Sequence, residues 1–155
     1  MAEQPSDNQD GRALVELASD TCWSLLRSQE VGRLGVVVRH WPLIIPVNYR
    51  LDEQTVVIRS AGVVAEAADH ANVTFQIDQV DPLAHTGWSV LVRGLAEVVG
   101  ENHRPWIAEH THQTRVEPWA PGDRGQWIRI ITQQVTGRRI TAGELTPTAG
   151  EWGYL

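Results

Sequence analysis

Apolar residues recur along most of this chain in short, β-branched or alternating runs, a pattern that predicts strands more often than helices. The clearest runs predict strands at 33–40, 43–51, 55–59, 72–78, 88–100 and 126–135. Three other segments predict short helices, at 19–27, 63–71 and 101–112. Closely spaced strands with few crossover helices predict a mainly β (α+β) fold, in which an antiparallel sheet of about six strands closes into a small barrel.

Several residues refine this pattern. Ser19 and Asp20 offer an N-cap for the first helix. Pro46 has no amide hydrogen, so its strand should lie at an edge or carry a bulge there. Gly94 lies within the longest strand and predicts a bulge or bend. The segment 136–140 is expected to form a turn with a short strand continuation, and 14–17 is a short apolar piece with no strand assigned to it.

The chain has 155 residues, of which 42% are hydrophobic, and this fits one domain with its own core. The polar residues 1–12 predict a disordered tail, and residues 13–140 form the predicted domain. Residues 141–155 are rich in Gly, Thr and Pro and are expected to be a C-terminal extension.

The net charge of −6 argues against a general binder of nucleic acids or anionic membranes. No apolar run is long enough to span a membrane, and a single cysteine, Cys22, fits a reducing cytoplasm, where we expect the protein to be located. All 13 basic residues are arginine, so no lysine can form a Schiff base or bind a phosphate. The six histidines are not spaced as a metal site, and none is expected.

The segment 59–62 joins a predicted strand to a predicted helix that begins at Val63. It places an arginine fork (Arg59), a hydroxyl (Ser60) and free backbone N–H groups at a helix start, a combination that suits a phosphate. The alternative is an ordinary solvated strand end.

Five segments together are similar to the pyridoxamine 5′-phosphate oxidase-like family of flavin-binding split-barrel proteins, in its actinobacterial branch of short single-domain members. They are SQEVGRLGVVV (28–38), LIIPVNYRLD (43–52), VVIRSAG (56–62), VTFQIDQVDPLAHTGWSVLVRGLAEVV (73–99) and WIRIITQQVTGRRI (127–140). The resemblance implies a six-stranded antiparallel split barrel that forms a homodimer, with two flavin sites between the subunits.

The resemblance also implies roles for individual residues. Pro46, Val47, Asn48 and Tyr49 would run along the flavin ring, Arg59 and Ser60 would hold its phosphate, and Trp88 and Ser89 would flank the flavin or the substrate space. Trp127, Arg129 and also Arg138 would reach the site from the partner subunit. Val63 stands near the position where family members commonly carry a phosphate-binding lysine, so the clamp lacks one positive charge.

These implications favour an oxidoreductase that uses FMN as its cofactor and acts on a small-molecule substrate. The deazaflavin 8-hydroxy-5-deazaflavin (coenzyme F-420), which related members use, is the alternative cofactor. A flavin-binding carrier without turnover, and a split-barrel dimer without flavin that acts as an interaction module, are the alternative functions. His85 and Tyr49 are candidate acid–base groups, and the sequence names no substrate.

Overall fold

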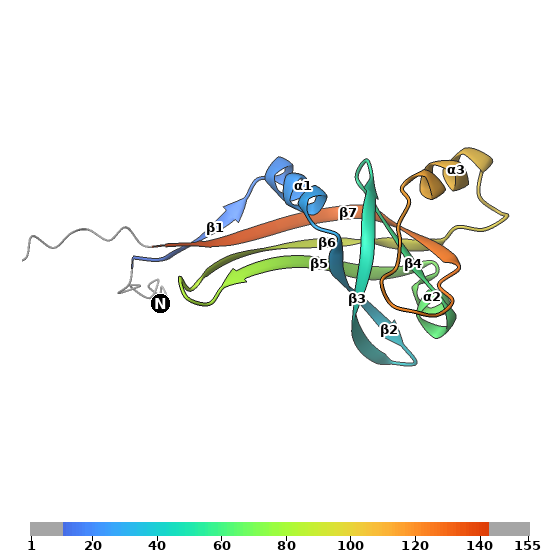
Figure 1. Ribbon diagram of the computed structural model, residues 1–155, viewed down its shortest axis with the longest axis horizontal. Helices are drawn as coiled ribbons and strands as arrows, with labels where there is room; N and C mark the ends of the chain where they lie inside the picture. The colour runs from blue at the N-terminus through green and yellow to red at the C-terminus, as the bar shows by residue number, and fades with distance from the viewer. Residues whose placement is uncertain (1–10, 143–155) are drawn as a thin grey trace, which may run out of the picture.

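The computed structural model describes residues 11–142, which form seven strands and three helices (Figure 1). The strands are β1 (Ala13–Leu17), β2 (Val31–Val38), β3 (Trp41–Asp52), β4 (Thr55–Ser60), β5 (Ala71–Asp81), β6 (Thr86–Val98) and β7 (Gln126–Thr141). The helices are α1 (Ser19–Ser28), α2 (Gly62–Ala68) and α3 (Pro105–Gln113). Residues 1–10 of the expected tail and 143–155 of the expected extension lie outside the described residues.

Six strands form a closed antiparallel barrel. They follow one another in the order β7, β4, β3, β2, β5 and β6, and β6 pairs again with β7 to complete the ring. The two longest strands, β6 and β7, run out of the barrel with β5 as a ribbon, which β1 extends at its edge (Figure 1). The predicted mainly β (α+β) fold with a six-stranded antiparallel barrel and short helices is therefore confirmed.

Tight turns set the register of the hairpins. Arg39 and His40 join β2 to β3, and both have positive φ, as two-residue hairpin turns require. Glu53 and Gln54 join β3 to β4, and in this turn only Glu53 has positive φ, at 53°. In the β5–β6 turn, the Asp81 carboxylate accepts hydrogen bonds from backbone amides two and three residues later.

The core is filled by the inward-facing half of each alternating strand. The largest fully buried side chains are Leu26, Leu34, Tyr49, Ile58, Phe75, Ile77, Ile128 and Ile130. Helix α1 closes one side of this core through Cys22, Trp23 and Leu26. Cys22 is a packing residue of this core, because its side chain is fully buried and burial raises the pKa of its thiol.

Two strand features match the sequence analysis. Pro46 pairs with Arg33 of β2, whereas β4 pairs with β3 only from Tyr49 onward, so Pro46 lies on an open edge. The register of β6 against β7 shifts between Arg93 and Gly94, which confirms the bulge. A Cβ atom at residue 94 would lie 2.3 Å from the Ile131 carbonyl oxygen, so only glycine allows this approach.

Two expectations were wrong. The N-cap of α1 is Ala18, not Ser19 or Asp20, because β1 leads directly into the helix and no side chain caps it. Residues 136–140 form no turn: β7 continues to Thr141 because it pairs there with β1 and β6 at once. Segment 14–17, to which the sequence analysis assigned no strand, is part of strand β1, and most of its residues are exposed.

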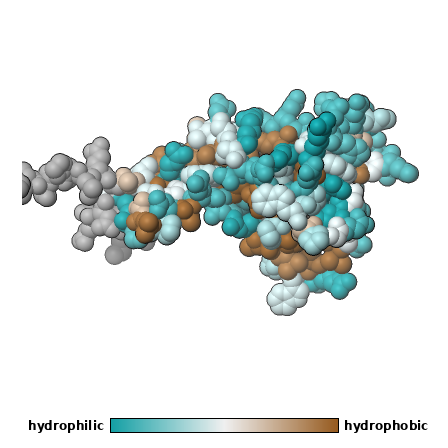
Figure 2. Space-filling view, viewed as in Figure 1, coloured by the Kyte–Doolittle hydropathy of each residue, from teal (hydrophilic) through white to brown (hydrophobic). Residues whose placement is uncertain are grey.

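Apolar side chains gather on the surface of the β2–β3 hairpin (Figure 2). Val37, Trp41 and Ile44 are all more than half exposed there. Within the part of the chain that the structure describes, no helix is long and apolar enough to cross a membrane.

Candidate functional site

The outer face of β3, β4 and β7 carries a row of polar and aromatic side chains. Arg59 of β4 pairs with Trp127 of β7, and Asn48 of β3 lies one step beyond the last β3–β4 pair, Tyr49 with Ile58. Because paired residues in a sheet share a face, Asn48, Arg59 and Trp127 lie in one row outside the barrel.

Arg59 is the centre of this row. Its guanidinium carbon lies 5.0 Å from the centroid of the Trp127 ring, a cation–π contact. Its Nε atom donates a hydrogen bond of 3.1 Å to the carbonyl oxygen of Arg124. The His112 ring of α3 lies 5.1 Å from the Trp127 ring on the same side of the barrel.

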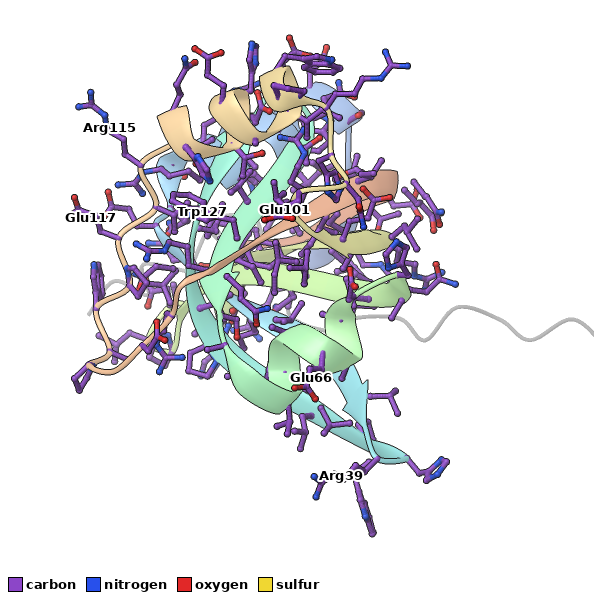
Figure 3. The ribbon with its side chains drawn as sticks, turned by 90° about the vertical axis from the view of Figure 1, so that its right-hand side faces the viewer. Arg39, Glu66, Glu101, Arg115, Glu117 and Trp127 are labelled. Atoms are coloured by element: carbon purple, nitrogen blue, oxygen red, sulfur yellow. The ribbon has the colours of Figure 1, made fainter. Side chains whose placement is uncertain are left out.

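Residues 114–125 link α3 to β7 and cross over this row; we call them the strap. Figure 3 shows Arg115 and Glu117 of the strap pointing away from the barrel, whereas Trp127 lies against it. Asn48 fixes the strap at one point, where its Oδ1 atom accepts a 2.8 Å hydrogen bond from the Trp119 amide. Arg59 fixes it at a second point through the Arg124 carbonyl.

Two buried donors in this region have no acceptor among the described residues. They are Nδ2 of Asn48 and Nε of Arg124. A cleft opens beside Asn48 and is lined by Arg50 of β3 and by strap residues including Thr114 and Trp119. Since a buried donor without an acceptor is unfavourable, the row is suited to a ligand that carries acceptor oxygens.

Strand alternation separates several residues that the sequence analysis grouped together. Pro46 and Asn48 face outward, whereas Val47 and Tyr49 face the core. The Tyr49 side chain is 1% exposed, and its hydroxyl donates a 2.6 Å hydrogen bond to the Leu26 carbonyl. Burial raises the pKa of Tyr49, with Arg50 acting weakly in the opposite direction, so Tyr49 is a core residue and not an acid–base group at the surface.

Ser60 also faces away from the row. It follows Arg59 directly in β4 and is buried, so its hydroxyl does not join the Arg59 guanidinium on the outer face. Val63 lies in the first turn of α2 with its side chain 47% exposed. An apolar side chain therefore occupies the position at which the resemblance expects a cation.

Arg129 is already paired within its own chain. Its Nη1 atom lies 2.7 Å from the Asp52 carboxylate and donates a 2.8 Å hydrogen bond to Thr111 of α3. Trp127 likewise contacts Arg59 of the same chain. Both side chains therefore make contacts on their own barrel, and their role toward the partner subunit stays a prediction.

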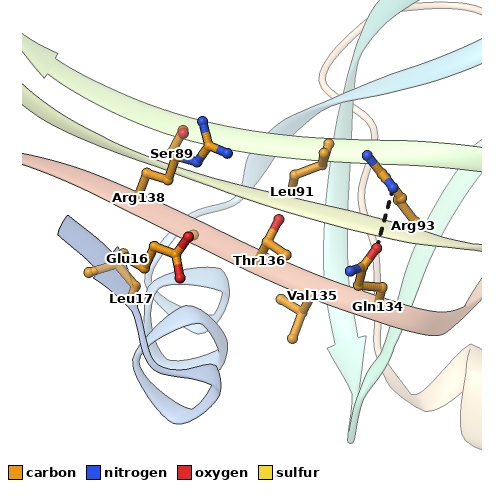
Figure 4. A pocket seen from close by; sticks show the side chains of 10 residues that line it. Glu16, Leu17, Ser89, Leu91, Arg93, Gln134, Val135, Thr136 and Arg138 are labelled. Atoms are coloured by element: carbon orange, nitrogen blue, oxygen red, sulfur yellow. Dashed lines mark hydrogen bonds between the residues drawn. The ribbon is translucent and has the colours of Figure 1, made fainter. Parts of the chain in front are cut away.

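Trp88 and Ser89 lie far from the row. Trp88 pairs with Arg139, and Trp127 is twelve residues earlier in β7, which corresponds to about 40 Å of strand. Ser89 faces a cleft of about 450 Å³ on the ribbon, together with Glu16, Arg93 and Arg138 (Figure 4). Trp88, the preceding residue, points to the opposite face and packs partly against the core.

The last candidate, His85, lies apart from the row. His85 lies in the exposed β5–β6 turn, where its Nδ1 atom is 3.3 Å from the Arg12 guanidinium. Within residues 11–142, no group of three or more metal-ligating side chains is close enough to hold an ion. The sequence analysis did not place Trp119 or Arg124 at the site, because no strand or helix pattern covers the strap.

Comparisons with known proteins agree with this architecture. The family model described as pyridoxamine 5′-phosphate oxidase matches residues 18–139, so the chain belongs to this family. An uncharacterized protein of Mycobacterium tuberculosis, Rv0080, is 33% identical over 146 residues, which are 90% of this chain and 93% of that protein.

Two solved structures are similar over most of the chain. The FAD binding protein from Mycobacterium smegmatis is 32% identical, with a TM-score of 0.68 over 81% of this chain and 98% of that chain. The putative pyridoxamine 5′-phosphate oxidase from Corynebacterium glutamicum is 28% identical, with a TM-score of 0.67 over 90% of this chain and 100% of that chain.

Proposed function

We propose that this protein binds a flavin on the outer face of its barrel, at the Asn48–Arg59–Trp127 row, and uses it to oxidise or reduce a small molecule. The observation that carries the proposal is the pair of buried donors without acceptors, Nδ2 of Asn48 and Nε of Arg124, beside Arg59. The name of the mycobacterial relative at 32% identity, an FAD binding protein, points to the same class of ligand.

The residues of the row fit the functional groups of a flavin. An arginine fork such as Arg59 matches the oxygens of a phosphate. The free amide donor of Asn48 suits a ring carbonyl, and the exposed Trp119 ring provides a flat apolar surface. When bound, the flavin supplies hydride transfer, whereas the protein binds it, orients it and limits its contact with water.

A complete site needs a second copy of the chain if it includes Ser89 and Arg138. These residues lie at the far end of the ribbon from Arg59 in one chain, and both line the cleft of Figure 4. We therefore propose a homodimer in which the ribbon of one subunit reaches the row of the other.

The test is a visible absorption spectrum of the freshly purified protein, followed by titration with FMN, FAD and the deazaflavin. Quenching of tryptophan fluorescence reports binding because Trp119 and Trp127 lie at the site. A flavin band or saturable binding to one cofactor supports the proposal, and Arg59→Gln should weaken that binding. The absence of a band and of saturation with all three cofactors would overturn it.

The same purified protein also tests the two alternative functions, a flavin carrier and a barrel without flavin. Flavin binding without transfer of electrons from NADH or NADPH to an added acceptor would indicate a carrier. A barrel without flavin is favoured by one observation: the strap already occupies Oδ1 of Asn48 and Nε of Arg59, and Val63 adds no charge. In that case the dimer would serve as an interaction module.

A further inference from the structure

We propose that Arg124 of the strap is a second anion-binding residue, which forms with Arg59 a paired-arginine clamp for the phosphate of the bound flavin. This inference rests on the proposed function and adds to it a residue that lies outside the predicted site.

The first argument is the position of the Arg124 backbone. Its carbonyl oxygen accepts the Arg59 Nε hydrogen bond at 3.1 Å, so the two residues are in direct contact although 65 positions separate them. Covalent geometry then limits the distance between their Nε atoms to about 10 Å. This limit allows one anion to contact both guanidinium groups.

The second argument is the state of the Arg124 side chain. Its Nε atom is buried and has no acceptor among the described residues. A donor nitrogen that is shielded from water without a partner is costly, so the site favours a ligand with an acceptor oxygen, and the positive charge of the half-buried Arg124 favours an anion. The two acidic residues of the strap, Glu117 and Asp123, are exposed, and neither makes an ion pair with Arg124 in residues 11–142.

The third argument is the second orphan donor. Nδ2 of Asn48 is also buried without an acceptor, and Asn48 holds the same strap through Trp119. The strap thus brings a cation from a distant part of the chain to the row, where the local helix start offers only Val63. Arginine suits this task because its planar fork binds phosphate oxygens in two parallel hydrogen bonds.

The experiment compares FMN with riboflavin, which lacks the phosphate, in the full-length protein and in Arg124→Gln. We expect Arg124→Gln to weaken FMN about tenfold to a hundredfold, as expected for a lost charge-assisted hydrogen bond, and to leave riboflavin unchanged. Arg124→Lys should recover part of the loss because it keeps the charge. Arg104→Gln is the matched control, since Arg104 is exposed at the start of α3, about 12 Å of helix from His112.

Equal loss of FMN and riboflavin binding, or no loss of FMN binding, in a folded Arg124→Gln protein would overturn the clamp while the flavin proposal stands. Thermal unfolding of each variant confirms that it is folded. Should the unmodified protein bind no flavin, the proposed function fails, and inorganic pyrophosphate then decides the clamp. Stabilisation of the unmodified protein but not of Arg124→Gln by pyrophosphate supports it, and equal stabilisation or none overturns it.

Discussion

At the scale of single residues, Gly137 shows how closely the ribbon packs against α1. A Cβ atom at this position would lie 2.6 Å from Sγ of Cys22 and 3.1 Å from Cδ1 of Leu17. We expect Gly137→Ala to reduce the free energy of unfolding by about 1–3 kcal/mol, because the buried neighbours must move. Urea unfolding followed by tryptophan fluorescence measures this change.

Two further variants test the cause. Gly100→Ala should have little effect on packing, since no atom lies within 4 Å of its added Cβ. In the Gly137→Ala background, Cys22→Ala should recover part of the lost stability by removing the sulfur. A double variant whose loss of stability equals or exceeds the sum of the two single losses would show that the clash is not the cause.

The buried hydroxyl of Tyr49 should make the free energy of unfolding depend on pH in the alkaline range. Burial raises the pKa of its hydroxyl, so the folded protein keeps this proton at a pH where the unfolded chain, with an ordinary pKa near 10, releases it. The stabilisation is therefore fully present below about pH 10 and is lost as the pH rises further, by about 1.4 kcal/mol per pH unit.

Unfolding in urea at several values between about pH 8 and pH 11 checks this dependence. Tyr49→Phe should be less stable at neutral pH, because the Leu26 carbonyl loses its 2.6 Å hydrogen bond, and should decline less steeply above pH 10. Parallel decline of both proteins would mean that another group controls the alkaline limb.

The sequence identified part of the residue row. Asn48, Arg59 and Trp127 were all predicted and do lie together, because the hairpin register fixes them on one face. Val47, Tyr49 and Ser60 were grouped with them as neighbours in sequence, although the two-residue period of a strand directs them inward. That period was a usable signal for separating the two sets.

At the scale of elements, the strap is held to the barrel by few bonds. We expect Asn48→Ala to increase hydrogen exchange at the Trp119 amide about fivefold, since this amide loses a hydrogen bond of roughly 1 kcal/mol. Asn48→Asp keeps an acceptor oxygen and should preserve the protection. The Ile107 amide, bonded to Arg104 at the start of α3, serves as an internal control whose exchange should not change.

An unchanged Trp119 exchange rate in Asn48→Ala would mean that the strap is held by other contacts.

The observed contacts between the strap and the barrel could not be foreseen from the sequence. The strap binds β3 and β4 across 71 and 65 positions, and no local pattern encodes these distances. Strands with alternating residues were predictable, whereas β1 was not, because it is defined by its pairing with β7 rather than by burial.

At the scale of the whole molecule, the two groups of candidate residues predict a site shared between subunits. A mixed dimer of one Arg59→Gln chain and one Arg138→Gln chain, purified through two different tags, should contain one site with both changes and one with neither. We expect it to bind flavin with unmodified affinity at half the stoichiometry. Each homodimer of a single variant should show weak binding at both sites.

A different result would follow if each site used one chain only. Every site of the mixed dimer would then carry one change, and no binding of unmodified affinity would remain. Light scattering gives the necessary control, because the protein must first have twice the 17.3 kDa mass of the chain. A monomer at micromolar concentration would contradict the shared site.

The place of β7 in the sheet also bears on how the protein is made. This strand pairs with β1, β4 and β6, yet it comes after all of them in the chain. During synthesis on the ribosome, the edges of β4 and β6 therefore stay open until residues 126–141 emerge. Exposed strand edges invite pairing with other chains, so we expect the nascent protein to be most prone to aggregation in the interval just before its last strand appears.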